Sequence, residues 1–293
     1  MWLLVLNRSS GKGKTSKKFL EFKALCDAQN IKYQIIDERS AELTEHRYQS
    51  ELSSSKIEVV VAFGGDGLIS LCLQKIVRSD IGLTVVPTGT GNDFARSIGT
   101  YGKSTEEIFN SIINSSKTKI DVALCESNER KRYFVQVLSI GFDATVNRFA
   151  NNMKYPKGKI KYTIAMLLLL PRAKNIDFEV KQDSDSIKIK SMLVAVANGS
   201  TYGGGMKILP DSSFKDGLLD LLYVDPVSKL TLLSIFPRVF KGTHTKHPAV
   251  HLLRSKNFEV IGSTDSYADG EFAGALPIRL SVIKDGLTTW ICK

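Results

Sequence analysis

Two glycine-rich turns, each directly after an apolar run, constrain the fold of this chain more than any other feature. Residues 57–63 are mostly β-branched and apolar, as in a buried parallel strand, and they lead into the glycine-rich segment 64–67. A helical stretch begins at Leu68. Because glycine permits unusual backbone angles and leaves amides open to a ligand, this strand, turn and helix N-terminus predict an anion site.

A second strand, residues 81–86, leads into Pro-Thr-Gly-Thr-Gly-Asn-Asp-Phe-Ala-Arg at 87–96. Together with Gly-Gly-Asp-Gly at 64–67, this motif resembles the nucleotide-binding core of the diacylglycerol kinase catalytic domain family, which includes bacterial soluble lipid kinases and sphingosine kinases. NAD kinases and phosphofructokinases carry a turn similar to the first motif. The second motif is longer and matches the family nearly throughout.

The length of 293 residues favours two domains, with an active site in the cleft between them. The net charge of +10 favours anionic partners, namely nucleotides, anionic lipid headgroups or nucleic acid, and charge alone does not choose among them. The four cysteines are widely spaced, which fits a reducing cytoplasm. The apolar runs at 1–6 and 164–170 are too short for a signal peptide or a membrane span.

Residues 1–120 predict a doubly wound α/β domain that binds the nucleotide. Its expected elements, besides those above, are strands at 2–6 and 32–36, helices at 16–29 and 105–115, and a helix capped by Ser40 or Thr44.

Residues 121–293 predict a β-rich, antiparallel, sandwich-like domain for the lipid acceptor. The expected strands are 133–139, 177–182, 186–190, 192–197, 218–224, 257–261 and 278–283. Two helices interrupt them, at 157–170 and at 229–241, the latter capped by Ser228.

The family resemblance implies which residues contact the nucleotide. The first strand of the family ends in Asn-Pro-x-Ser-Gly, and Arg8 stands in place of the proline in this chain. Two further departures are the absence of a family threonine near Asp37 and the presence of Leu68 where the family has a hydroxyl residue. The expected ATP-binding residues are Asn7, Ser10, Gly11, Gly64, Gly65, Asp66, Gly67, Leu68, Gly89, Thr90, Gly91, Asn92 and Asp93.

Two residues are expected to act in catalysis. Asp66 would organise a metal ion or water at the phosphates, with Asp93 as its companion, and the alternative for either carboxylate is a helix N-cap. Glu271 follows Asp269 and Gly270 in a turn, and the matching glutamate of the family is the proposed general base. An ordinary surface glutamate in a β-turn is the alternative.

Segments 198–206 and 216–220 resemble the second-domain signature of the same family. The resemblance implies a structural Mg²⁺ held by the carboxylate of Asp216 and the backbone carbonyls of Ser213 and Leu218, whereas a plain type I turn is the alternative. His244, His247 and His251 are expected to be loop residues that line or pack the cleft, not zinc ligands.

An apolar stretch edged by basic residues is the candidate for the acceptor side. It could line a lipid slot, touch a membrane surface, or be a core helix with basic ends. Its residues are Tyr155, Tyr162, Met166, Leu167 to Leu170, Arg172 and Lys174.

We therefore expect a kinase that uses ATP and Mg²⁺ to phosphorylate a lipid alcohol, with diacylglycerol as the leading acceptor and phosphatidic acid as the product. Sphingoid bases, undecaprenol and phosphatidylglycerol are alternative acceptors, and NAD kinase or a non-catalytic nucleotide- or lipid-binding module are alternative functions. The expected partners are the lipid and, transiently, an anionic membrane surface, with a possible homodimer and no nucleic acid.

Overall fold

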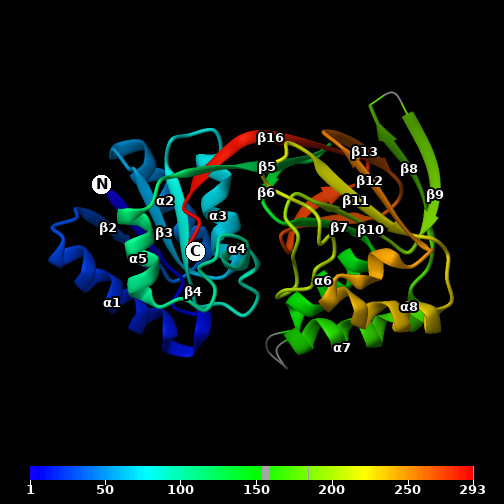
Figure 1. The fold of residues 1–293 in the computed structure, drawn as a ribbon, viewed down its shortest axis with the longest axis horizontal. Helices are drawn as coiled ribbons and strands as arrows, with labels where there is room; N and C mark the ends of the chain where they lie inside the picture. Colours follow the sequence, from blue (N-terminus) through cyan, green and yellow to red (C-terminus); the bar gives the residue numbers. More distant parts are fainter. Residues whose placement is uncertain (154–158, 184, 293) are drawn as a thin grey trace. The chain divides into compact units, whose positions relative to one another are not determined.

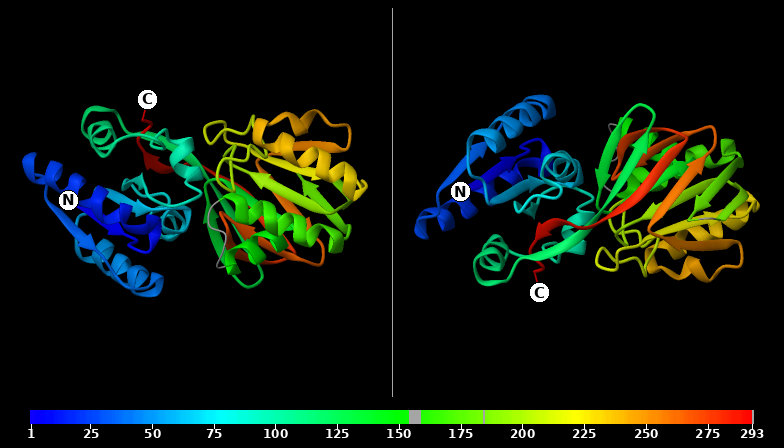
Figure 2. Two further views of the ribbon diagram at one scale, coloured as in Figure 1. Left: turned by 90° about the horizontal axis from the view of Figure 1, so that it is seen from below. Right: turned by 90° about the horizontal axis from the view of Figure 1, so that it is seen from above.

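The computed structural model describes residues 1–153, 159–183 and 185–292. The chain forms two compact units, shown from three sides in Figures 1 and 2. Unit 1 comprises Met1–Ile120 and Asp285–Lys293, and unit 2 comprises Asp121–Lys284. Residues 285–293, which we expected in the second domain, thus belong to the first unit. The predicted fold class, an α/β domain followed by a β-rich sandwich-like domain, is confirmed.

Unit 1 is built on a parallel sheet in the order β2-β1-β3-β4, and the end of β16 pairs with β4 through Thr288 and Gly82. Largely apolar runs form β1, β3 and β4, with valine prominent in β3 and β4, and every residue of these three strands is buried. The strands are β1 (Trp2–Leu6), β2 (Tyr33–Ile36), β3 (Val59–Gly64), β4 (Gly82–Pro87) and β16 (Ile278–Thr289).

Helices cover this parallel sheet on both faces. Phenylalanines of α1 and α5 pack on alternate residues of β1 and β3, while Tyr48 of α2 is buried and donates a hydrogen bond to the carbonyl of Cys72 in α3. Ser40 caps α2 and Ser104 caps α5. The helices are α1 (Lys14–Ala28), α2 (Ala41–Ser54), α3 (Asp66–Ile76), α4 (Asp93–Ser97) and α5 (Thr105–Asn114), with a 3₁₀ turn η1 (Ser10–Gly13).

Unit 2 is a sandwich of antiparallel sheets. One sheet has the order β12-β11-β10-β7-β14-β15; the other contains β16-β13-β8-β9, with β5 beside β16 and β6. Apolar residues of both sheets form one core between them. The strands are β5 (Thr118–Ser127), β6 (Lys131–Phe134), β7 (Val137–Gly141), β8 (Ile176–Gln182), β9 (Asp185–Ser191), β10 (Leu193–Ala197), β11 (Leu219–Val224), β12 (Val250–Ser255), β13 (Asn257–Ile261), β14 (Asp265–Ala268) and β15 (Glu271–Ala275).

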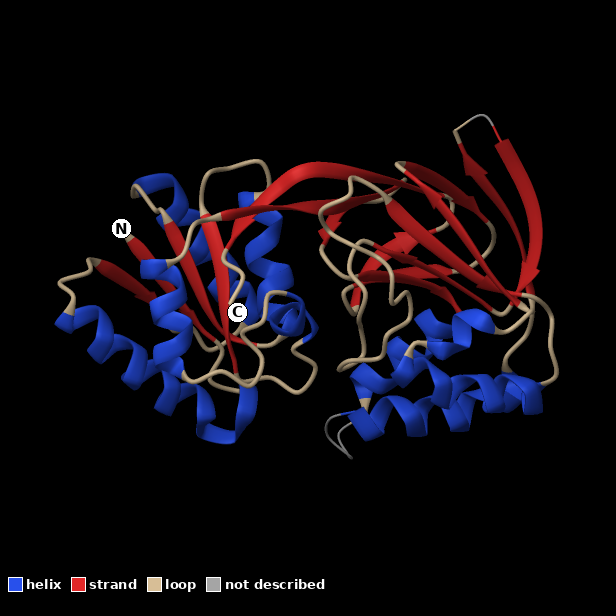
Figure 3. Ribbon diagram, in the orientation of Figure 1, coloured by secondary structure: helices blue, strands red, loops and turns tan. Residues whose placement is uncertain are grey.

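Helices of unit 2 pack together on the side of the six-stranded sheet away from this core, and Figure 3 shows them gathered along the strands. They are α6 (Phe142–Asn152), α7 (Lys159–Leu169), α8 (Lys229–Ile235), and the 3₁₀ helices η2 (Leu170–Arg172), η3 (Phe236–Lys241) and η4 (Thr243–Lys246).

Several local expectations differ from the structure of unit 2, among them the loop position expected for His251, which lies in strand β12. The expected strand 133–139 is divided between β6 and β7, and α6 was not expected. The expected helix 229–241 is α-helical only to Ile235 and continues as 3₁₀ helix, because Pro237 has no N–H for a hydrogen bond to the preceding turn.

Candidate active site

Three turns of unit 1 follow the carboxyl ends of its parallel strands. The first turn (residues 7–13) follows β1, the second (65–67) follows β3, and the third (88–92) follows β4. The carboxyl ends of parallel strands lie at one edge of a sheet, where ligands of open α/β sheets bind. Most nucleotide-binding residues predicted from the sequence lie in these turns. The others are Gly64, which ends β3, and Leu68 and Asp93, which directly follow the second and third turns, so the structure brings the whole set to one edge.

The first turn is closed by Asn7, whose Oδ1 accepts hydrogen bonds from the backbone N and the Oγ of Ser9 at 3.1 and 2.6 Å. Gly11 has a φ of +72°, and a Cβ there would lie 2.5 Å from the carbonyl oxygen of Thr88. The buried hydroxyls of Thr15 and Thr88 are 2.8 Å apart. The first turn therefore lies directly against the third.

The second and third turns also meet through bare backbone. The N–H groups of Thr88 and Gly89 donate to the carbonyl of Gly64 at 2.9 and 3.2 Å. A Cβ added to Gly89 would lie 2.6 Å from the Cα of Gly65. Asn92 has a φ of +57°, and its Nδ2 donates to the carbonyl of Gly89 at 2.7 Å, which closes the third turn. The two glycine motifs thus form one contiguous backbone surface.

Asp66 connects the second turn to the helix that follows the third. Its Oδ1 accepts a hydrogen bond from the backbone N of Phe94 at 3.2 Å. Burial raises the pKa of Asp66 above its usual value, and the amides of Phe94, Asp93 and Asn92 oppose that rise. A Cβ added to Gly91 would contact Oδ2 of both Asp66 and Asp93, so both carboxylates lie on one side of Gly91.

Two of the departures from the family pattern form a single contact. The Nε of Arg8 donates to both carboxylate oxygens of Asp37, at 2.8 and 2.7 Å, and Arg8 Nη1 donates to Ser16 at 3.2 Å. Hydrogen bonding to Asp37 raises the pKa of Arg8. This pair ties the first turn to the end of β2. The third departure, Leu68, is buried against the Cα of Gly64, where it contributes packing.

Glu271 of unit 2 begins β15 directly after a two-residue hairpin loop, and its side chain is exposed. Asp269 and Gly270 have φ values of +48° and +85°, as in a type I′ turn. The Asp269 carboxylate accepts hydrogen bonds from the backbone N–H groups of Val135, Gln136 and Val137, at 2.9 to 3.1 Å. The loop that carries Glu271 is therefore fixed to the segment between β6 and β7.

Asp216 lies in an exposed turn of unit 2 that contains Gly217 at a φ of +73°. Its Oδ1 accepts a hydrogen bond from the N of Leu218 at 3.1 Å, and its Oδ2 lies 3.8 Å from Arg254 Nη1. No three His, Cys, Asp or Glu side chains cluster as a metal site among the described residues. The predicted set needs only one carboxylate, with the carbonyls of Ser213 and Leu218, and these hard oxygen donors fit Mg²⁺.

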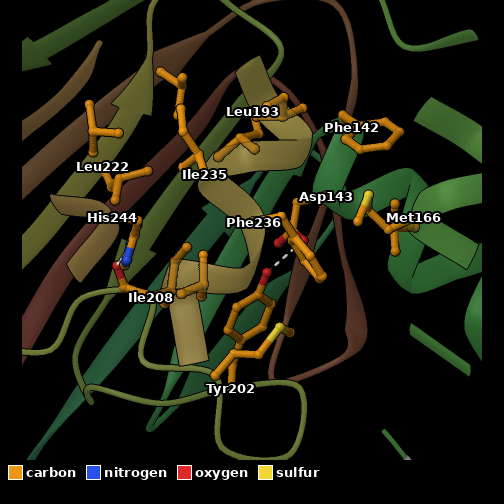
Figure 4. A pocket seen from close by; sticks show the side chains of 16 residues that line it. Phe142, Asp143, Met166, Leu193, Tyr202, Ile208, Leu222, Ile235, Phe236 and His244 are labelled. Atoms are coloured by element: carbon orange, nitrogen blue, oxygen red, sulfur yellow. Dashed lines mark hydrogen bonds between the residues drawn. The ribbon is translucent and has the colours of Figure 1, made fainter. Parts of the chain in front are cut away.

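An apolar pocket lies inside unit 2, between the six-stranded sheet and the helices that cover it (Figure 4). Sixteen residues line it, and only Asp143, Tyr202 and His244 among them are polar. The cavity has a volume of about 70 Å³. One water molecule needs only ~10–15 Å³ on the same measure. The pocket is thus large enough for a stretch of hydrocarbon.

The polar residues of this pocket are held by specific contacts. Tyr202 Oη donates to Asp143 Oδ1 at 2.7 Å, and Asp143 Oδ2 is buried without a hydrogen-bond partner among the described residues. Burial raises the pKa of Asp143 to about 6. His244 is buried with Nε2 2.8 Å from the carbonyl oxygen of Ile208, and burial lowers its pKa. A carboxylate that is easier to protonate than usual therefore lies in an apolar pocket.

Sequence reasoning missed Asp143. The available signal was an acidic residue two positions after the end of the apolar segment that forms β7. Only part of the helix expected to bind the acceptor faces the pocket: Met166 lines it, whereas Leu167 and Leu168 are exposed. Tyr155 and the side chain of Tyr162 lie outside the described residues.

Two family models match the chain. The diacylglycerol kinase catalytic domain model matches residues 1–125, and the model of the YegS C-terminal NAD kinase beta sandwich-like domain matches residues 136–290. The name of the second model likens its sandwich to that of NAD kinases, so the first model is the one that distinguishes between the two kinase types.

Curated relatives agree with the first model. A diacylglycerol kinase from Mycobacterium tuberculosis is 35% identical over 233 residues, which cover 78% of this chain and 75% of that protein. A diacylglycerol kinase from Staphylococcus epidermidis is 26% identical over 282 residues, covering 94% and 86%. A crystal structure of a putative diacylglycerol kinase from Bacillus anthracis superposes with a TM-score of 0.79 at 21% identity, covering 100% of this chain and 96% of that one. This last likeness concerns the fold.

Proposed function

Because this chain belongs to the diacylglycerol kinase catalytic domain family, and is a lipid kinase, we propose that it transfers the γ-phosphoryl group of ATP to the hydroxyl of diacylglycerol. The observation that carries the lipid part of this proposal is the apolar pocket of unit 2, with its single pair of Asp143 and Tyr202. An acyl chain suits such a lining, and a glycerol hydroxyl or ester oxygen suits the polar pair.

The three turns of unit 1 are the proposed nucleotide site. Gly65 and Gly89 bring backbone close to backbone, which leaves space beside the turns for phosphate oxygens and excludes side chains, while Gly91 leaves room for the carboxylates of Asp66 and Asp93. Asp66 and Asp93, on one side of Gly91, would orient water or a metal at these phosphates. Mg²⁺, when bound with ATP, neutralises charge that develops on the phosphoryl oxygens.

Glu271 is the proposed general base. The acceptor oxygen forms a bond to the γ-phosphorus as the bond to the leaving oxygen of ADP breaks, and the hydroxyl proton passes to the Glu271 carboxylate. The Asp269 contacts support this role, since they hold the loop that carries Glu271. The proposed structural Mg²⁺ at Asp216, Ser213 and Leu218 would stabilise unit 2 and take no part in the transfer.

We also propose that the enzyme works at the cytoplasmic membrane surface, in transient contact with anionic lipids. We further propose that it forms a homodimer, and light scattering of the purified protein measures the mass that tests this. Within the described residues no helix has the length and apolar character needed to cross a membrane.

The test is an acceptor panel. Purified protein with ATP and Mg²⁺ receives diacylglycerol, sphingosine, undecaprenol, phosphatidylglycerol or NAD, and mass spectrometry detects the phosphorylated product. We expect phosphatidic acid as the main product. A different phosphorylated lipid would correct the acceptor, and NADP or no product at all would contradict the proposal.

A further inference from the structure

Exposed apolar side chains gather on the helices that cover the pocket of unit 2. Leu230 of α8 is 79% exposed and Leu168 of α7 is 57% exposed. We call the following five residues the docking face: Phe149, Leu167, Leu168, Leu230 and Phe240. Large apolar side chains that gather at a surface mark a site of contact with a protein, a ligand or a membrane.

These helices are neighbours in space. Their inward side chains form one apolar cluster, and Figure 3 shows α6, α7 and α8 together on one side of the strands. Lys229, next to Leu230, donates a hydrogen bond from Nζ to the carbonyl of Pro171, three residues after Leu168. The Phe240 ring packs edge-on against Phe236, which lines the pocket. The docking face is therefore the outer side of the same layer whose inner side lines the pocket.

The charge of these segments is entirely positive. Residues 144–176 contain seven lysines and arginines, residues 226–247 contain four, and neither segment contains Asp or Glu. Several of these cations are exposed and form no ion pair with another described residue: Arg172, Lys174, Arg238, Lys241 and Lys246. Arg148 lies 3.5 Å from Asp265. Such a surface repels basic partners and attracts an anionic one.

We propose that the docking face seats on a bilayer surface that contains anionic lipids. The leucines and phenylalanines would enter the boundary between headgroups and acyl chains while the surrounding cations contact the headgroups. A bilayer suits this combination of apolar and basic groups, and it is also where a lipid acceptor resides. The choice of a lipid bilayer as the partner rests on the proposed function. The same helices contribute Met166, Leu232 and Phe236 to the pocket proposed for the lipid acceptor.

Vesicle sedimentation tests the docking face directly. The full chain is mixed with phosphatidylcholine vesicles, with or without phosphatidylglycerol. The test variant is Leu168→Ser/Leu230→Ser, and the matched control is Leu20→Ser/Leu43→Ser, which removes leucines that are 62% and 50% exposed on α1 and α2 of unit 1. Melting temperatures of all three proteins are compared, so that only folded variants are interpreted.

We expect the wild type and the control to bind anionic vesicles more tightly than neutral ones, and the test variant to bind anionic vesicles about tenfold more weakly. A variant with Arg238→Ser and Lys241→Ser should lose about fivefold per charge and lose it only with anionic vesicles. The proposal is overturned if the wild type does not sediment with vesicles, if neutral and anionic vesicles bind equally, or if the control loses as much as the test variant.

Activity separates this proposal from the proposed function. With water-dispersed dioctanoylglycerol, the Leu168→Ser/Leu230→Ser variant should phosphorylate at a rate within about twofold of the wild type, because neither leucine lines the pocket. With long-chain diacylglycerol in anionic vesicles its rate should fall in step with its binding. Failure of the wild type on both acceptors contradicts the proposed function and leaves the sedimentation result as the separate test of the docking face.

Discussion

Gly65 and Gly89 approach so closely that a Cβ on Gly89 would lie 2.6 Å from the Cα of Gly65, a separation that real Cβ atoms essentially never show. The glycines belong to different turns, and each turn follows its own buried strand. Their contact gives the two glycine motifs a joint role: both are needed to form one backbone surface at the edge of the sheet.

Gly89→Ala is therefore expected to displace the second and third turns, because the clash is with backbone on one side and with Asn92 Oδ1 at 2.9 Å on the other. We expect at least about a tenfold loss of ATP affinity, measured by titration calorimetry. Gly102→Ala is the control for backbone strain without a clash, since alanine is strained at the Gly102 φ of +87° but its Cβ would meet nothing within 4 Å. Equal ATP affinity in both variants would contradict the joint role of the turns.

Asp66→Ala should lower turnover by at least about 10² while the protein stays folded, if the carboxylate orients a metal or water at the phosphates. The hydrogen bond from Phe94 N to Oδ1 complicates this test, and Asp66→Asn addresses it by keeping an oxygen acceptor without the charge. Asp80→Ala, at an exposed position of unit 1, is the control. Activity of Asp66→Asn near that of the wild type would reduce Asp66 to a structural role.

The elements of unit 1 could be predicted because its strands are continuous apolar runs and its caps are local signals. Strand β1 has the predicted bounds, and of the two expected caps of α2, Ser40 and Thr44, Ser40 is the one observed. The two glycine turns were found for the same reason. Local pattern did not reveal that Arg8 pairs with Asp37, since the two residues follow different strands and each, viewed alone, is only a departure from the family motif.

Two features could not be predicted: the pocket of unit 2, and the return of the C-terminal segment, residues 285–293, to unit 1. Both depend on contacts between segments that are distant in the sequence. Asp143, Tyr202 and His244 meet in one pocket although they come from three separate parts of the sequence. Trp290 is buried in the core of unit 1, against Gly82, while the strand that leads to it starts in unit 2. A period-2 pattern identifies such a strand and gives no information about its partner.

Asp216→Ala should lower the melting temperature in the presence of Mg²⁺ and make it independent of added Mg²⁺, because a cation bound only by the folded state stabilises that state. Differential scanning fluorimetry with a Mg²⁺ titration measures both effects. Asp211→Ala, an exposed carboxylate in the same loop, should keep the response. A wild type without any Mg²⁺-dependent shift in melting would identify the segment as an ordinary turn.

Asp143→Asn should change how stability depends on pH. Burial raises the pKa of Asp143 to about 6, whereas an aspartate in the unfolded chain has a pKa of about 3.9. Between these two pH values the folded state therefore keeps a proton that the unfolded state has released. The wild type should therefore lose stability as pH rises from about 4 to 6, and the variant should not lose this part. Melting curves from pH 4 to 8 measure the difference. The control is Asp177→Asn, at a side chain that is 85% exposed, and its stability should depend on pH as that of the wild type does. If the stability of Asp143→Asn also depends on pH as that of the wild type does, the raised pKa of Asp143 is contradicted.

Glu271→Gln tests the central claim, that the turns of unit 1 hold ATP while Glu271 accepts the proton of the acceptor hydroxyl. The substitution keeps size and hydrogen-bonding reach and removes basicity. Loss of a positioned base costs about 10² to 10⁴ in rate.

The decisive measurement is the transfer of labelled phosphate from γ-labelled ATP to diacylglycerol by the wild type and by Glu271→Gln, with ATP affinity determined on the same preparations. We predict labelled phosphatidic acid from the wild type, and a rate about 10² to 10⁴ lower from the variant at nearly unchanged ATP affinity. Unchanged transfer by Glu271→Gln, or a collapse of ATP affinity together with the rate, would contradict the account.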